Sequence, residues 1–111
     1  MSASPAVELV YDRDCPNVER AREQLRLALG RAGLPARWKE WDRDAIETPS
    51  ELRAFGSPTV LVNGRDVASR DTESDHRPDA NSCRVYVDQG TLRGVPPLAL
   101  IVSALMETGR G

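Results

Sequence analysis

The sequence predicts a small α/β domain in which a four-stranded mixed sheet is covered by helices on both faces. The expected element order is strand, helix, strand, helix, strand, hairpin strand and helix. Three observations support this: a short strand at 7–11 leads directly into an amphipathic helix, the run 59–62 continues into the hairpin dipeptide at 63–64, and a second amphipathic helix follows at about 98–106. A strand–helix–strand unit packed with a hairpin and a closing helix places a sheet between helices.

The first strand and helix have clear boundaries in the sequence. Alternating apolar residues at 7–11 indicate a half-buried strand. Pro16 suits the first position of a helix, which makes Cys15 the predicted N-cap residue. Apolar residues then recur at helical spacing, and Gly33 followed by Pro35 ends the helix.

The middle of the chain predicts a strand, a short helix and a hairpin. A second strand is expected at 36–41. The run 48–51, Thr-Pro-Ser-Glu, has the pattern of a capping box and predicts a short helix that ends at Gly56. Asn-Gly at 63–64 is a strong hairpin signal, so the chain should return as an antiparallel strand at 65–68.

The last third of the chain combines a polar segment with a closing helix. We expect the polar run at 69–82 to be a long flexible loop, followed by a strand-like run at 83–87 and the helix at about 98–106. With 111 residues, the whole chain 1–111 is predicted to form a single domain.

Composition excludes some classes of partner. The net charge is −2 and the sequence pI is about 5.4, whereas phosphate backbones and anionic membranes attract proteins with clustered positive charge. We therefore expect neither a nucleic-acid partner nor a membrane partner. Residues 1–6 lack the basic and apolar pattern of a signal peptide, and the apolar run 96–105 is half as long as a membrane span, so we expect a cytoplasmic protein.

Two cysteines, Cys15 and Cys83, are the candidate reactive groups. A cysteine at a helix N-terminus faces unpaired backbone N–H groups and the positive end of the helix dipole, and both favour the nucleophilic thiolate. The topology predicts that the segment from residue 69 begins at the same end of the sheet as Cys15, which brings Cys83 within reach. Cys83 is then either a resolving thiol or a small buried side chain.

The element order resembles the thioredoxin fold, and three local features carry the resemblance. Cys15 directly follows the first strand, Ser57-Pro58-Thr59 precedes the third strand, and a helix follows the hairpin. The segments 56–66 and 83–86 are also similar to those of small thioredoxin-like (seleno)proteins, whose relatives include proteins described as alkylmercury lyase-like. The resemblance implies a cis Ser57–Pro58 bond and a substrate site formed by Ser57, Pro58, Thr59 and Pro16 beside the Cys15 sulfur.

The sequence departs from thioredoxin at its second cysteine. The motif reads Cys15-Pro16-Asn17-Val18, with Val18 where the resolving cysteine of a dithiol motif would stand. A mechanism with both sulfurs in one motif is therefore excluded.

Three functions remain open at this point. The first is a thiol-dependent oxidoreductase acting on protein disulfides, small thiols or peroxides, with Cys15 as the reactive thiol, Cys83 as resolving thiol and no cofactor. The second is a binding module in which Cys15 and Cys83 hold a soft metal ion such as Hg(II), Cu(I) or Zn(II), for which thiolates are suitable ligands. The third is a redox-inert interaction domain that uses the same fold.

Overall fold

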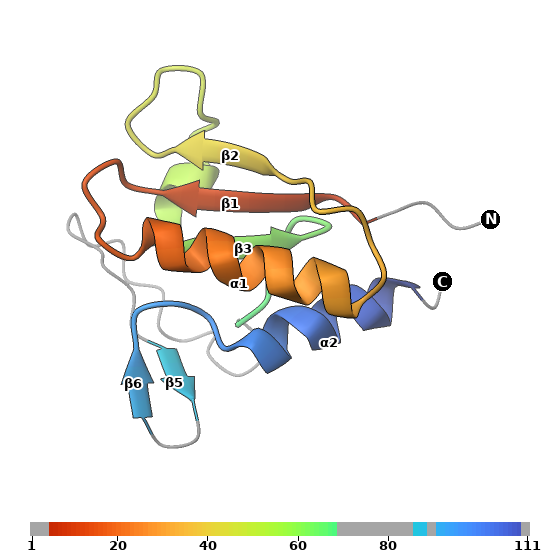
Figure 1. Cartoon of the computed structure of the whole chain (residues 1–111). Coiled ribbons are helices and arrows are strands. Elements are labelled where there is room, and N and C mark those ends of the chain that lie inside the picture. The colour runs from red at the N-terminus through yellow and green to blue at the C-terminus, as the bar shows by residue number, and fades with distance from the viewer. Residues whose placement is uncertain (1–4, 69–85, 89–90, 110–111) are drawn as a thin grey trace.

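The protein, seen in a computed structural model, is a small α/β domain built on a four-stranded mixed sheet (Figure 1). The structure describes residues 5–68, 86–88 and 91–109. The strand order is β2-β1-β3-β4, formed by β1 (Val7–Tyr11), β2 (Lys39–Asp42), β3 (Thr59–Val62) and β4 (Arg65–Asp66). β1 runs parallel to β2 and antiparallel to β3, and β4 is antiparallel to β3. This arrangement is compatible with the predicted thioredoxin-like fold.

The two α-helices of the described residues lie on one face of the sheet. Leu9 of β1 pairs with Val60 of β3, so their side chains share a face. These two residues belong to one buried cluster with residues of α1 (Val18–Arg31) and α2 (Leu98–Gly109). The core of the protein therefore lies between the sheet and the two helices.

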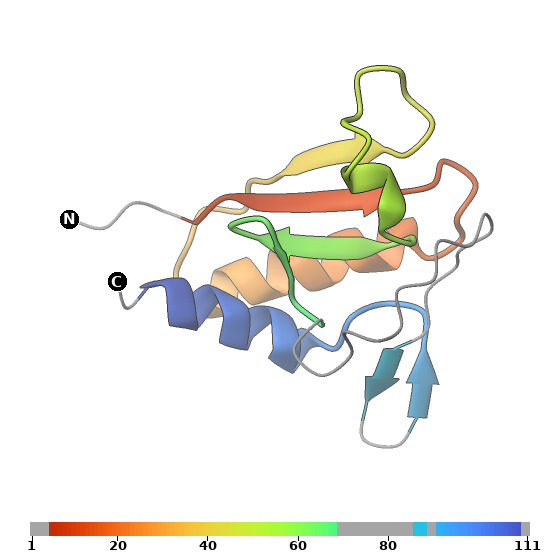
Figure 2. The ribbon, with the colours of Figure 1, turned by 180° about the vertical axis from the view of Figure 1, so that it is seen from behind.

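The opposite face carries much less helix than the sequence predicted. There the described residues contain only the one-turn 3-10 helix η1 (Leu52–Ala54), seen in front of β1 and β3 in Figure 2. The expected capping box does not form, because the Thr48 hydroxyl donates a hydrogen bond to the main-chain oxygen of Asp42 (2.6 Å) and the side chain of Glu51 makes no capping bond in the described structure. The prediction of helices on both faces is therefore not confirmed, since η1 is the only helical turn on this face among the described residues.

The C-terminal end of α1 and the turn of the β3–β4 hairpin both require residues with positive φ. Gly33 has φ +73°, and the N–H groups of Gly33 and Leu34 donate to the oxygens of Gly30 and Leu29, which is the hydrogen-bond pattern of a Schellman motif. Asn63 and Gly64 have φ values of 53° and 82°, as a type I′ turn requires. The helix stop and the hairpin turn are therefore confirmed.

Several other boundaries differ from the prediction. The second strand is Lys39–Asp42 rather than 36–41, and the fourth strand ends at Asp66 rather than at residue 68. β5 (Tyr86–Asp88) pairs with β6 (Thr91–Arg93), a strand that the sequence did not predict. These two strands form a separate hairpin that projects from the main body beside the start of α2 (Figures 1 and 2).

A half-buried ion pair joins α1 to the edge strand β2. Arg22 donates two hydrogen bonds to the Glu40 carboxylate, at 2.9 and 2.8 Å, and also pairs with Glu19. The Trp38 indole N–H donates to the same carboxylate (2.9 Å), and the Arg22 guanidinium lies over the Tyr11 ring. The bonds from Arg22, followed by the one from Trp38, hold the pKa of Glu40 below its ordinary value.

Candidate functional site

Cys15 lies in the turn between β1 and α1, and it is not the N-cap of the helix. Its N–H donates to the oxygen of Asp12 (3.0 Å), and its oxygen accepts from Val18 N–H (3.4 Å). The N-cap residue is Asn17, whose φ of −97° and ψ of 4° suit the third residue of a type I turn. Pro16 therefore occupies the second position of that turn, a position that proline favours, and the prediction that it begins the helix is wrong.

The thiol of Cys15 is only partly accessible. The described part of the chain contains one of the two cysteines, Cys15, and its side chain is half-buried and packs against the hydrophobic core. Pro16 beside it is exposed. Cys15 therefore keeps some accessible surface while it also contacts the core.

Asp12 connects the Cys15 turn to two other segments. Its main-chain N–H donates to Ser57 Oγ (2.9 Å), and its two carboxylate oxygens each accept from Arg43 Nη1 at 3.0 Å. Arg43 follows β2 and also donates to the main-chain oxygen of Arg53. The turn after β1 is therefore bonded both to the segment before β3, through Ser57, and to the segment after β2, through Arg43.

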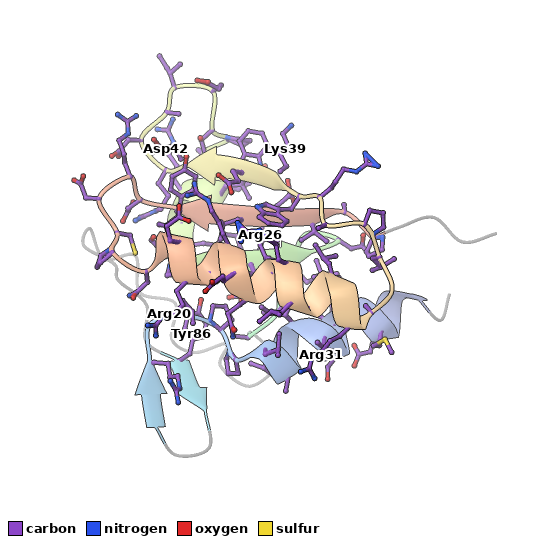
Figure 3. The ribbon with its side chains drawn as sticks, viewed as in Figure 1. Arg20, Arg26, Arg31, Lys39, Asp42 and Tyr86 are labelled. Carbon is purple, nitrogen blue, oxygen red and sulfur yellow. The ribbon has the colours of Figure 1, made fainter. Side chains whose placement is uncertain are left out.

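A second ion pair crosses the same end of the sheet. Arg13 pairs with Asp42 at 2.9 Å, and Figure 3 shows Asp42 at the end of β2. The main-chain N–H of Asp44 and the Arg13 guanidinium both hold the pKa of Asp42 below its ordinary value. Asp12 and Arg13 follow β1, whereas Asp42 ends β2 and Arg43 follows it. Each of these two segments therefore supplies one cation and one carboxylate to the two ion pairs.

The segment Ser57-Pro58-Thr59 lies at the same end of the sheet as Cys15. Thr59 pairs with Val10 in the antiparallel register of β1 and β3, which places it beside the end of β1. The Ser57–Pro58 peptide bond is cis, as we predicted. Ser57 and Thr59 are each 0 % exposed, and Pro58 is also fully buried. Substrate contact by Ser57, Pro58, Thr59 and Pro16 stays a prediction.

Two residues beside this segment were missed by the sequence analysis. The Tyr86 hydroxyl donates to the main-chain oxygen of Pro58 (2.5 Å), and Figure 3 shows Tyr86 between the N-terminal half of α1 and the β5–β6 hairpin. Gly94, just after β6, approaches Asn17 so closely that a Cβ atom there would stand 2.2 Å from Asn17 Nδ2. The Cys15 turn, the proline segment and the hairpin therefore form a ring of mutual contacts.

The sequence held only a weak signal for this ring. Gly94, in the run Gly-Val-Pro-Pro at 94–97, suggests that another segment lies close to the backbone there. The sequence does not indicate that this segment contains Asn17. Tyr86 and Pro58 are 28 residues apart, and no local pattern shows which main-chain oxygen a tyrosine hydroxyl will meet.

The predicted partnership of Cys15 with Cys83 is not tested. Cys83 and the predicted loop at 69–82 lie outside the described residues. Within 5–68, 86–88 and 91–109, no group of three or more His, Cys, Asp or Glu side chains is placed to hold a metal ion. A disulfide or a shared soft metal between the two cysteines stays a prediction.

One pocket of about 300 Å³ lies at the opposite end of β1 from Cys15. It is lined by residues at the start of β1 and around the end of α1: Pro5, Val7, Leu29, Leu34, Pro35 and Arg37. Because Val7 begins β1 and Cys15 follows its end, this pocket is separate from the candidate site.

Comparisons of the chain with protein-family models, with curated proteins and with solved structures found no match. The helices among the described residues are too short or too polar to cross a membrane.

Proposed function

We propose that this chain is a thioredoxin-like, thiol-dependent oxidoreductase with Cys15 as its reactive group. The observation that carries the proposal is the 2.9 Å hydrogen bond from Asp12 N–H to Ser57 Oγ, which joins the turn that contains the half-buried Cys15 to the segment Ser57-Pro58-Thr59. The mixed sheet with α1 directly after β1 supports the same fold assignment.

The proposed chemistry begins with the Cys15 thiolate. The sulfur attacks a disulfide to form a mixed disulfide and release a thiolate, or it is oxidised by a peroxide to a sulfenic acid with release of water or an alcohol. A second thiol, either Cys83 or an external small thiol, then attacks the Cys15 sulfur. Attack on the mixed disulfide releases the bound thiol, whereas attack on the sulfenic acid releases water, and both leave Cys15 in a new disulfide with the attacking thiol. Small thiols in solution then reduce this disulfide by exchange, which restores the Cys15 thiolate and produces a small-molecule disulfide. No cofactor is required for these steps.

The experiment compares the wild-type chain with Cys15→Ser and Cys83→Ser variants. Reduced protein is mixed with a small thiol and either a disulfide or a peroxide, and consumption of the oxidant is followed. We expect Cys15→Ser to abolish protein-dependent turnover. Cys83→Ser should slow turnover at low thiol concentration, and added thiol should restore the rate if Cys83 is the resolving group.

A different result would favour the metal-binding alternative. Turnover that is unchanged in Cys15→Ser contradicts the proposed function. Uptake of one Hg(II) per chain, without turnover and lost in either cysteine variant, would identify a soft-metal binding module instead.

A further inference from the structure

The proline segment next to Cys15 presents no open surface to a substrate. Ser57 and Thr59 are 0 % exposed, and Pro58 is less than 2 % exposed. A ligand cannot contact side chains that have no accessible surface unless the surrounding segments first move apart. This property distinguishes the segment from Cys15, which is half-buried, and from Pro16, which is exposed.

Three polar groups of this segment already have partners within the chain: the Ser57 and Thr59 hydroxyls and the main-chain oxygen of Pro58. Ser57 Oγ accepts from the N–H of Asp12, and the Thr59 hydroxyl donates to the oxygen of Gly56 (2.7 Å). The main-chain oxygen of Pro58 accepts from the Tyr86 hydroxyl. A peptide that sought hydrogen bonds here would have to displace protein donors and acceptors, and the displaced groups would then be unsatisfied.

Tyr86 comes from a part of the chain outside the main sheet. It begins β5, and the β5–β6 hairpin pairs only within itself among the described strands. Tyr86 is 4 % exposed, so the hairpin meets the proline segment through a buried contact. Gly94, at the other end of the same hairpin, packs against Asn17. The hairpin is thereby held against the Cys15 site at both of its ends.

We infer that the site of the proposed oxidoreductase accepts small disulfides and rejects extended protein segments, and that Tyr86 is a positioning residue that enforces this choice. The inference rests on the proposed function. The thiolate of Cys15 attacks one sulfur of a small disulfide, forms a protein mixed disulfide and releases the other half as a thiolate. A small thiol in solution then attacks the mixed disulfide and regenerates Cys15 together with a new small disulfide.

The test uses two probes that share one leaving group. Both are mixed disulfides of thionitrobenzoate, one with mercaptoethanol and one with an unstructured ten-residue peptide that contains one cysteine, so release of the coloured anion reports attack by Cys15. The Cys83→Ser background leaves Cys15 as the single thiol of the full-length chain. A short peptide with the sequence of residues 11–18 supplies the reference rates of an unfolded thiol.

We expect Cys15 to react with the small probe faster than the reference peptide does. We also expect the ratio of the peptide-probe rate to the small-probe rate to be about tenfold lower for Cys15 than for the reference peptide. Tenfold is the factor expected from the loss of one hydrogen bond of ordinary net strength. Tyr86→Phe should raise the rate with the peptide probe and leave the rate with the small probe unchanged. Tyr11→Phe is the matched control and should change neither rate.

The outcomes separate the inference from the proposed function. If Cys15 reacts faster than the reference with both probes and shows no preference, the oxidoreductase stands and the substrate inference is overturned. If Cys15 reacts with neither probe faster than the reference, the proposed function itself fails. If Tyr86→Phe does not fold, the preference of Cys15 in the Tyr86 protein for the small probe over the peptide probe still tests the substrate inference. If Tyr86→Phe folds and keeps the same preference, Tyr86 does not enforce it.

Discussion

Substitution of Gly94 by alanine should displace the Asn17 side chain, whose outer atoms occupy the space beside Gly94. The new Cβ would lie 2.2 Å from Asn17 Nδ2 and 2.6 Å from Asn17 Cγ. An ordinary contact needs about 3.5 Å, so the Asn17 side chain must move by roughly 1.3 Å or take another rotamer. The backbone of Gly94 is not in the left-handed region, so the predicted penalty is steric.

The size of the effect follows from two opposing contributions. Overpacking of a formed contact costs about 1–3 kcal/mol. Replacement of glycine by alanine also restricts the unfolded chain, which offsets about 0.4–1 kcal/mol of that cost. We therefore expect Gly94→Ala to lower the free energy of unfolding by about 1–2 kcal/mol.

A double-mutant cycle isolates the steric part. Asn17→Ala removes all three atoms that the new Cβ would meet, and in the described structure the Asn17 side chain makes no capping hydrogen bond, so this variant alone should cost little. Urea unfolding of the wild type, both single variants and the double variant gives the coupling energy. The contribution of the unfolded chain is the same in both backgrounds and cancels.

The expected coupling is about 1 kcal/mol or more, with Gly94→Ala tolerated once Asn17 is truncated. Additive costs within about 0.5 kcal/mol would refute the reasoning, because they would show that a side chain at position 94 does not press against Asn17, the N-cap residue of α1. A neutral Gly94→Ala variant would refute it as well.

Three further predictions concern the sheet and the Cys15 turn. The pKa of Glu40 is lowered in the folded protein, so its ion pair with Arg22 stabilises the fold above the unfolded pKa and is lost as pH falls. Glu40→Gln should therefore lower the free energy of unfolding by about 1 kcal/mol near neutral pH and reduce the further loss of stability between about pH 5 and 3. An unchanged dependence of stability on pH in this range would contradict a stabilising role of the ion pair. Gly64→Ala places a side chain at φ +82° and should lower the free energy of unfolding by about 1–2 kcal/mol, measured by thermal or urea unfolding. Gly30→Ala, at an exposed helical position with open space, should raise it by about 0.5–1 kcal/mol. If both variants changed stability in the same direction, the result would contradict the positive-φ turn at Gly64. Ser57→Ala leaves the N–H of Asp12 without its acceptor and should cost about 1–3 kcal/mol in urea unfolding and speed hydrogen exchange of that amide; an unchanged exchange rate would show that the bond contributes nothing.

Local sequence chemistry predicted the parts of the fold that depend on neighbouring residues. The turn at Asn63 and Gly64 and the stop of α1 at Gly33 each need a positive φ, and glycine supplies it at little cost. The short strands β1 and β3 follow from runs of apolar and β-branched residues. These features were correct because the preference is contained within a few consecutive residues.

Local chemistry failed at two positions, through a hydrogen-bond partner outside the motif in one case and through a competing local turn in the other. The Thr48 hydroxyl, read as a helix cap, instead donates to the main-chain oxygen of Asp42. Pro16, read as the first residue of α1, instead stands within a turn that closes on Val18. In both places the sequence motif was compatible with two structures, and motif spacing by itself does not distinguish them.

The sequence by itself determined an α/β chain with a cysteine after the first strand and a proline before the third. Only the tertiary structure decided how these two meet: Ser57 accepts the N–H of Asp12 across 45 residues, and Tyr86 covers the oxygen of Pro58 across 28 residues. The physical reason is that hydrogen bonds between distant residues depend on the packing of whole elements, whereas turns and helix ends depend on backbone preferences of the residues within them.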